Sequence, residues 1–215
     1  MDVLNLIQRY DPTQDPSLPS KALYDPNSQI LQLYANKENG SLNFIEGSLV
    51  IYVDGGCRGD EFSSNARAAY GVFAGPGSRY NRADLVAKKK NKLEQTSTRA
   101  EIEALSRGVD VVRQIMLRKA YVKDVYIATD SEYLVKAMTE WMPKWLKSGG
   151  RRADDGGEVA HFSLLVDIFL RLNAIYYAAG GEKGQGKPVK LWHVPREQNV
   201  EANRLVDQIL DECGH

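Results

Sequence analysis

Two aspartates follow apolar segments that have the composition of buried strands. Asp54 comes directly after residues 49–53 and precedes two glycines, and Asp130 ends the apolar segment 124–130. An unpaired buried carboxylate is costly, so each one should be paired, hydrated or bound to a cation. A strand-end aspartate before Gly-Gly is also a common turn residue. The two aspartates therefore indicate chemistry only if other carboxylates occupy matching positions.

Glu101 supplies a third carboxylate, in the first turns of a helix predicted over residues 96–116. It is flanked by Ala100 and Ala104 and so lies near the apolar side of that helix. If the strands before Asp54 and Asp130 are neighbours, three acids converge in a mostly dry place and raise each other's pKa. A divalent cation relieves this repulsion, and Mg²⁺ prefers oxygen ligands from a few carboxylates plus a substrate phosphate. Spacing alone leaves a cation site as one alternative beside the turn role that such aspartates more often have.

The elements that must position these acids alternate between strands and helices. Short connections between the first strands favour an antiparallel meander, and the later helix–strand alternation favours parallel strands. We therefore expect an α/β fold with a five-stranded mixed sheet, antiparallel over strands 1–3 and parallel for strands 4 and 5, flanked by helices. The strands are expected at 49–54, 66–77, 80–88, 124–130 and 187–194, and the helices at 96–116, within 131–150 with an interruption near Pro143, at 161–178 and at 199–213.

Residues 1–46 carry four prolines among polar residues and are expected to form an extended arm, with one domain over residues 47–215. Acidic and basic residues balance at 28 each, so any nucleic-acid-binding surface must be local. Cys57 and Cys213 form neither a disulfide framework nor a zinc-binding spacing. The start is too polar for a signal peptide, and no apolar run approaches the roughly 20 residues of a membrane span. We expect a soluble, monomeric protein of the cytoplasm or nucleus.

Four segments resemble, in order, the active-site blocks of the ribonuclease H type 1 family, and together they cover about residues 48–212. They are YVDGGCRGD, TSTRAEIEAL, IATDSEYLVKAMTEWMPKWLKSGG and HVPREQNVEANRLVD. The resemblance implies an RNase H-like fold and hydrolysis of the RNA strand of RNA–DNA hybrids to 3′-hydroxyl and 5′-phosphate ends. It also implies that Asp54, Glu101 and Asp130 are catalytic residues that bind two Mg²⁺ ions, with Mn²⁺ as a substitute.

The family's last catalytic aspartate falls at a position where this sequence has Asn203. Asparagine keeps a carbonyl oxygen for a hard cation but removes a negative charge, which weakens the attraction for Mg²⁺. The enzyme could work with this neutral fourth ligand at a higher Mg²⁺ demand, and Asp207 or the loop residue Glu197 could act as an auxiliary group. The alternatives are a catalytically impaired module that binds hybrids or duplexes, and a structural domain of the same fold from a retroelement polyprotein.

The resemblance further implies contacts with the nucleic acid around the acidic residues. Polar residues ahead of Glu101 would contact the minor groove, although helix capping also explains them. A pair of tryptophans would support the DNA-binding channel, although their spacing is also typical of a hydrophobic core. Lysines near the tryptophans give a local positive charge that could follow phosphates. The expected contacts are Cys57, Arg58, Thr96, Ser97, Thr98, Trp141, Lys144, Trp145 and Lys147. The basic run 88–92 is expected to be a solvated hairpin tip.

Overall fold

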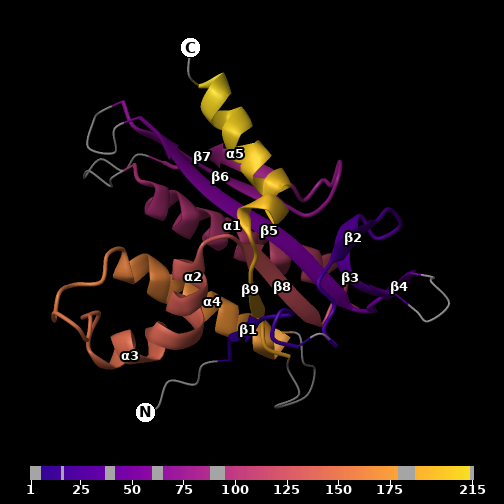
Figure 1. Ribbon diagram of the computed structural model, residues 1–215, viewed down its shortest axis with the longest axis horizontal. Coiled ribbons are helices and arrows are strands. Elements are labelled where there is room, and N and C mark those ends of the chain that lie inside the picture. The colour runs from indigo at the N-terminus through magenta and orange to yellow at the C-terminus, as the bar shows by residue number, and fades with distance from the viewer. Residues whose placement is uncertain are drawn as a thin grey trace.

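The computed structural model describes residues 6–15, 17–36, 42–59, 65–87, 95–178 and 187–213. These residues form one mixed β-sheet with helices on both faces (Figure 1). The strands are β1 (Gln8–Tyr10), β2 (Ala22–Asp25), β3 (Ile30–Asn36), β4 (Leu42–Phe44), β5 (Ser48–Arg58), β6 (Arg67–Phe73), β7 (Arg82–Leu85), β8 (Asp124–Thr129) and β9 (Lys190–His193). The helices are α1 (Ser97–Arg118), α2 (Glu132–Lys136), the π-helix η1 (Ala137–Trp141), α3 (Met142–Lys147), α4 (Phe162–Ala178), the 3₁₀-helix η2 (Arg196–Gln198) and α5 (Val200–Glu212).

The predicted mixed sheet is confirmed. Strands β5, β6 and β7 form the antiparallel meander, and β5, β8 and β9 are parallel to one another. In the parallel register Tyr52 of β5 is the partner of Ala128 of β8. Strand β5 is apolar on both faces over its first half because helices or loops cover both sides of the sheet there.

The predicted number of five strands was wrong, because the described residues form nine. Four further strands lie between residues 8 and 44. Strand β1 pairs in parallel with β9. Strand β3 pairs antiparallel with β5, with β2 and with β4. Three of these strands have only three or four residues, and prolines separate β1 from β2, so alternation gives little signal there. Strand β1 pairs with β9, which lies more than 100 residues further along the chain, and no local sequence pattern can indicate such a pairing.

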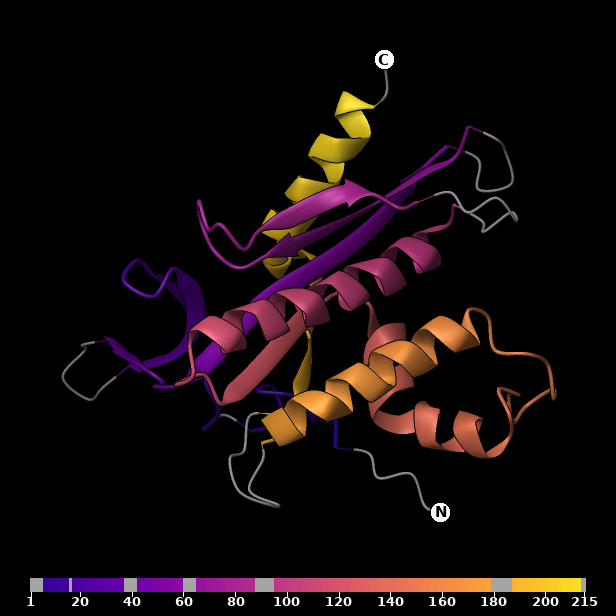
Figure 2. The same ribbon diagram turned by 180° about the vertical axis from the view of Figure 1, so that it is seen from behind.

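Among the described residues, three apolar clusters hold the layers together, and the smallest packs Val206 and Leu210 of α5 on Ala69 of β6. The largest one lies between the sheet and helices α1 and α4, which Figure 2 shows along the same face of the sheet. Arg171 of α4 ties these helices together through Ser106 and Asp110 of α1. The second cluster covers the opposite face, where Tyr10 of β1 makes edge-to-face contacts with Tyr126 at 4.8 Å and Trp192 at 5.3 Å. Residues before the predicted domain thus pack on the central sheet.

The region after β8 is helical from Glu132 to Lys147, and its regular α-helical pattern is interrupted before Pro143. This proline is the second residue of α3, and its missing N–H is tolerated there because the α-helical pattern begins anew at Met142. The preceding turn is the π-helix η1, which ends at Trp141. Among the described residues, no helix combines the length and apolar character needed to cross a membrane. The predicted basic tip at 88–92 lies outside the described residues.

Candidate active site

Two of the three carboxylates lie side by side because their strands are parallel neighbours. Asp54 follows the Tyr52–Ala128 pair by two residues on β5, and Asp130 follows it by two residues at the end of β8. Only 6% of the Asp54 surface is exposed. The backbone of Asp54 also pairs with Gly71 of β6, so the carboxylate is fixed on a strand that is bonded on both edges.

Glu101 reaches the same place because α1 packs unusually close to β5. A Cβ atom on Gly55 would lie only 2.1 Å from the carbonyl carbon of Ala100 and 2.2 Å from the backbone nitrogen of Glu101. Glycine is therefore required here for space, since its φ is not in the left-handed region. The helix begins at a defined point because the Thr96 side chain accepts a hydrogen bond from the backbone N–H of Arg99 at 3.1 Å.

Each carboxylate accepts one hydrogen bond from a different side chain. The Asn203 amide donates to Asp54 at 2.9 Å, and the Ser131 hydroxyl donates to Glu101 at 2.6 Å. The Asn199 amide donates to Asp130 at 2.9 Å. Ser131 begins α2 and Asn199 precedes α5, so two helix starts carry the donors that orient the acids.

Electrostatics in this cluster raises the pKa of two of the acids. Burial raises the pKa of Asp54 to about 6, the Asn203 hydrogen bond opposes this, and the charge of Asp130 adds to the rise. Burial also raises the pKa of Glu101, against the hydrogen bond from Ser131 and with a further contribution from Asp130. Arg196 of η2 partly offsets the repulsion at Asp54. A bound cation would relieve the same repulsion.

The donor chemistry of this cluster fits a hard divalent cation. Its possible ligands are carboxylate and carboxamide oxygens, which Mg²⁺ and Mn²⁺ prefer over nitrogen or sulfur. The described residues contain no group of three His, Cys, Asp or Glu side chains gathered around one point. The amide and hydroxyl donors instead take one oxygen of each acid, and rotation of the Asn203 amide would present its oxygen to a cation beside Asp54.

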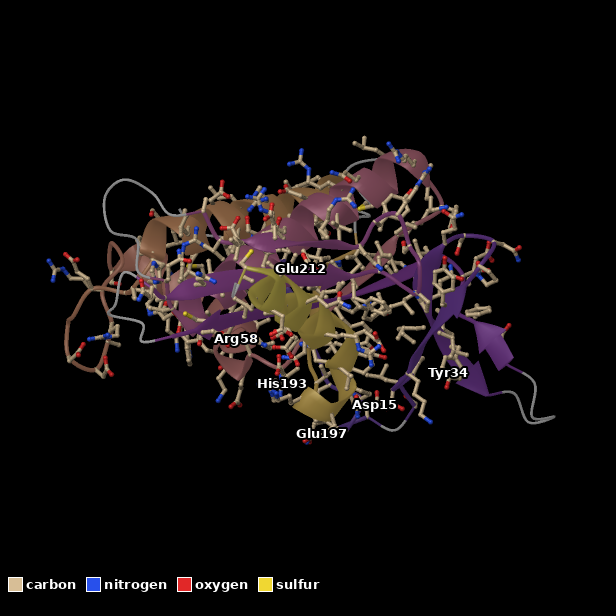
Figure 3. All side chains as sticks on the ribbon, turned by 90° about the horizontal axis from the view of Figure 1, so that it is seen from above. Asp15, Tyr34, Arg58, His193, Glu197 and Glu212 are labelled. Carbon is tan, nitrogen blue, oxygen red and sulfur yellow. The ribbon has the colours of Figure 1, made fainter. Side chains whose placement is uncertain are left out.

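The two proposed auxiliary acids lie apart from this cluster. Asp207 forms an ion pair with Arg58 at 2.9 Å, and Arg58 also pairs with Asp211 one turn further along α5. Glu197 is exposed on η2. Figure 3 shows Glu197 and His193 at the end of α5 opposite Glu212, with Arg58 to one side of the helix. Arg58 thus bridges β5 to α5, an interaction that the sequence patterns did not indicate.

The other predicted contact residues divide into engaged and exposed groups. The Cys57 thiol donates to the Gln95 carbonyl at 2.9 Å, and Thr96 is the helix cap. Ser97 and Thr98 are exposed at the start of α1, and Lys144 and Lys147 are exposed on α3. Trp145 is 9% exposed and Trp141 is half-buried, with ring centroids 5.5 Å apart.

The local positive charge expected near the tryptophans is partly neutralised. Lys136 pairs with Glu132 at 2.8 Å, and Arg152 pairs with Asp155 at 2.6 Å. Exposed pairs of this kind contribute little to stability, and their cations remain able to exchange partners.

Sequence reasoning missed the two residues that orient Glu101 and Asp130. Ser131 follows Asp130 directly, and Asn199 stands at the start of the last helix. Both positions are typical of helix caps, so the residue types alone indicated a local role. The signal that distinguishes them is burial, which depends on the packing of α5 and α2 against the strand ends.

Comparison with known proteins agrees with this arrangement. The family model described as RNase H matches residues 46–212. Ribonuclease H1 of Rattus norvegicus is 26% identical over 172 residues, which cover 80% of this chain and 52% of the relative, so the chain spans about half the length of such mammalian relatives. Ribonuclease H of Methylococcus capsulatus is 31% identical over 167 residues, which cover 78% of this chain and 92% of the relative.

A solved structure of the foamy viral protease–reverse transcriptase in complex with an RNA/DNA hybrid has a TM-score of 0.51 at 18% identity, covering 74% of this chain and 19% of that one. At this identity the likeness concerns the fold. The sequence matches extend across β5, α1, β8 and α5, the four elements that carry the acids and their amide partners. On these grounds the chain belongs to the ribonuclease H family.

Proposed function

We propose that this chain is a metal-dependent endonuclease that hydrolyses the RNA strand of RNA–DNA hybrids, leaving 3′-hydroxyl and 5′-phosphate ends. The observation that carries the proposal is the placement of Asp54, Glu101 and Asp130, from two strands and a helix, where burial and mutual repulsion raise the pKa of two of them. The ribonuclease H named above, matched over 92% of its length, supports the activity and its class of substrate.

The roles of the residues follow from their placement. When bound, two divalent metal ions, Mg²⁺ or Mn²⁺, would supply an activated water and charge stabilisation at the scissile phosphate. Asp54 and Asp130 would hold the ions, because their carboxylates lie on neighbouring strands. Glu101, oriented by Ser131, would position the attacking water. Asn203 would turn its amide oxygen toward the ion held by Asp54.

Substrate selectivity would come from the surfaces around the acids. The exposed hydroxyls of Ser97 and Thr98 stand at the start of α1, three to four residues before Glu101, and suit contact with 2′-hydroxyl groups in a minor groove. The half-buried Trp141 and the exposed Lys144 and Lys147 suit the DNA strand, through stacking and phosphate attraction. Cys57 and Arg58 would contribute through the end of β5.

One observation favours a second candidate function, a hybrid- or duplex-binding module without turnover. The Asn203 amide presents its N–H to Asp54, so the fourth position offers a hydrogen-bond donor where an acidic side chain would offer a ligand. A site with three negative charges binds a divalent cation less strongly than a site with four.

Cleavage of a labelled RNA–DNA hybrid by the chain and by Asn203→Asp, over Mg²⁺ and Mn²⁺ titrations, distinguishes the two functions. We expect the chain to cleave, and the variant to need about tenfold less Mg²⁺, which corresponds to ~1.4 kcal/mol of added attraction. Asp54→Asn is the inactive control. If only Asn203→Asp cleaves, the chain is a binding module, and if neither cleaves, the enzymatic proposal is wrong.

A further inference from the structure

Asn199 joins the two strands that carry the aspartates. Its side-chain nitrogen donates one hydrogen bond to the Val53 carbonyl at 3.0 Å and another to the Asp130 carboxylate at 2.9 Å. Val53 directly precedes Asp54 on β5. Both partners are acceptors only, so the orientation of the amide is determined by its surroundings, with the NH₂ group toward the strands.

Local helix chemistry does not account for this side chain. Asparagine before a helix normally uses its side-chain oxygen to cap a backbone N–H of the first turn. Asn199 stands at that position before α5 but makes no side-chain capping bond, and its φ and ψ of −99° and 19° differ from the extended backbone of such a cap. The side chain has been diverted from the helix into the protein interior.

The remaining oxygen of the Asn199 amide is buried and has no hydrogen-bond partner among the described residues. Only 1% of the Asn199 surface is exposed. Leaving a buried acceptor unpaired is unfavourable, and such groups in folded proteins usually coincide with a functional demand. An apolar residue here would avoid the unpaired oxygen but would leave Asp130 and Val53 without their donor.

We propose that Asn199 is a positioning residue that fixes the Asp130 carboxylate relative to Asp54 by bridging Asp130 to the backbone of β5. It acts through Asp130, in the way that outer partners of metal-binding side chains set their orientation. This inference rests on the proposed function, because it gives Asp130 a ligand to hold. Asn203, one turn later on α5, differs, because its amide donates to Asp54 in the metal-free chain and would turn its oxygen toward the ion when the metal binds.

The test compares the chain with Asn199→Ser and with a control, Asn173→Ala. Asn199 makes no side-chain capping bond to α5, so serine removes no contact that starts this helix, but its one hydroxyl hydrogen cannot serve both Val53 and Asp130. Asn173 is a half-buried asparagine of α4 that bonds only backbone groups, accepting from Leu6 at 2.8 Å and donating to Phe169 at 2.9 Å. Asn199→Ala, which has no donor, is measured beside them.

Four quantities are measured for each protein: the thermal midpoint, the Mn²⁺ affinity by calorimetry without nucleic acid, and kcat and KM for the hybrid. We expect both Asn199 variants to bind Mn²⁺ about ten- to a hundredfold more weakly and to lose kcat with little change in KM. We expect Asn173→Ala to lower the thermal midpoint while leaving Mn²⁺ affinity and kcat unchanged.

Unchanged Mn²⁺ affinity and kcat in folded Asn199→Ser would overturn the positioning role, as would a failure of the unaltered chain to bind Mn²⁺. If the unaltered chain binds Mn²⁺ but does not cleave the hybrid, the proposed function is wrong. The Mn²⁺ affinities of the two Asn199 variants then decide the positioning role on their own.

Discussion

Gly55→Ala tests the close contact on which the position of Glu101 depends. The added Cβ would lie 2.1 Å from the carbonyl carbon of Ala100, and ordinary van der Waals contact begins at 3.4 Å. The α1 backbone must therefore retreat from β5 by about 1.3 Å. The obstructing atoms belong to the backbone of a helix that is packed on both sides, so no side-chain rotation can relieve the clash.

The expected magnitude follows from the cost of overpacking a core, which is typically about 1–3 kcal/mol. A clash against backbone places Gly55→Ala at the upper end, about 3 kcal/mol. For a domain of this size each kcal/mol lowers the thermal midpoint by about 2–4 °C, so the expected loss is about 6–12 °C. A displacement of a catalytic group by about 1 Å can lower the rate about 100-fold, and Glu101, which we propose to be such a group, moves with α1.

Gly56→Ala is the matched control on the same strand. Its Cβ would meet the ends of two side chains of α5, Val206 at 3.0 Å and Leu210 at 3.9 Å, which can shift by a few tenths of an ångström. We expect its thermal midpoint and its rate of hybrid cleavage to stay close to those of the unaltered chain. Both variants are assayed by thermal unfolding and by hybrid cleavage at saturating Mg²⁺.

The reasoning would be refuted if Gly55→Ala and Gly56→Ala had the same thermal midpoint and the same kcat. Such a result would mean that α1 is not held against β5 by this contact. A lower midpoint with unchanged kcat would show that Glu101 keeps its place although the packing is lost, and the catalytic part of the argument would then be wrong.

Two further predictions concern charge and the N-terminal strands. In the metal-free folded chain the pKa of Asp54 is raised to about 6, whereas in the unfolded chain it has its ordinary value of 3.8. Protonation of Asp54 therefore stabilises the folded chain fully below about pH 4, and this contribution is lost as the pH rises through about 6. Asp54→Asn should therefore raise the thermal midpoint above pH 6 and flatten its pH dependence, and equal pH profiles would contradict this. Deletion of residues 1–46 should lower the thermal midpoint by several degrees, because it removes Tyr10 and Leu31 from the apolar cluster that contains Tyr126 and Trp192. An unchanged midpoint in thermal unfolding would show that residues 1–46 do not stabilise the rest of the domain.

The sequence by itself indicated the three acids as candidates and determined the elements that carry them. Strand-end aspartates after apolar runs, and an N-capped helix between them, are local patterns whose period and composition indicate structure without knowledge of the fold. Because parallel strands end at the same edge of a sheet, neighbouring strands were enough to predict that Asp54 and Asp130 lie together. The matched family and the observed mixed sheet agree with this part of the analysis.

Only the tertiary structure decided how the acids are held and what covers the sheet. Ser131 and Asn199 are good helix caps in any context, and their hydrogen bonds to Glu101 and Asp130 exist because α2 and α5 begin beside the strand ends. Asp207, one turn after Asn203, could have faced the acids, but Arg58 of β5 pairs with it instead. Short strands such as β1 are stabilised by partners distant in sequence, so their pairing is a property of the assembled fold and leaves little trace in local pattern.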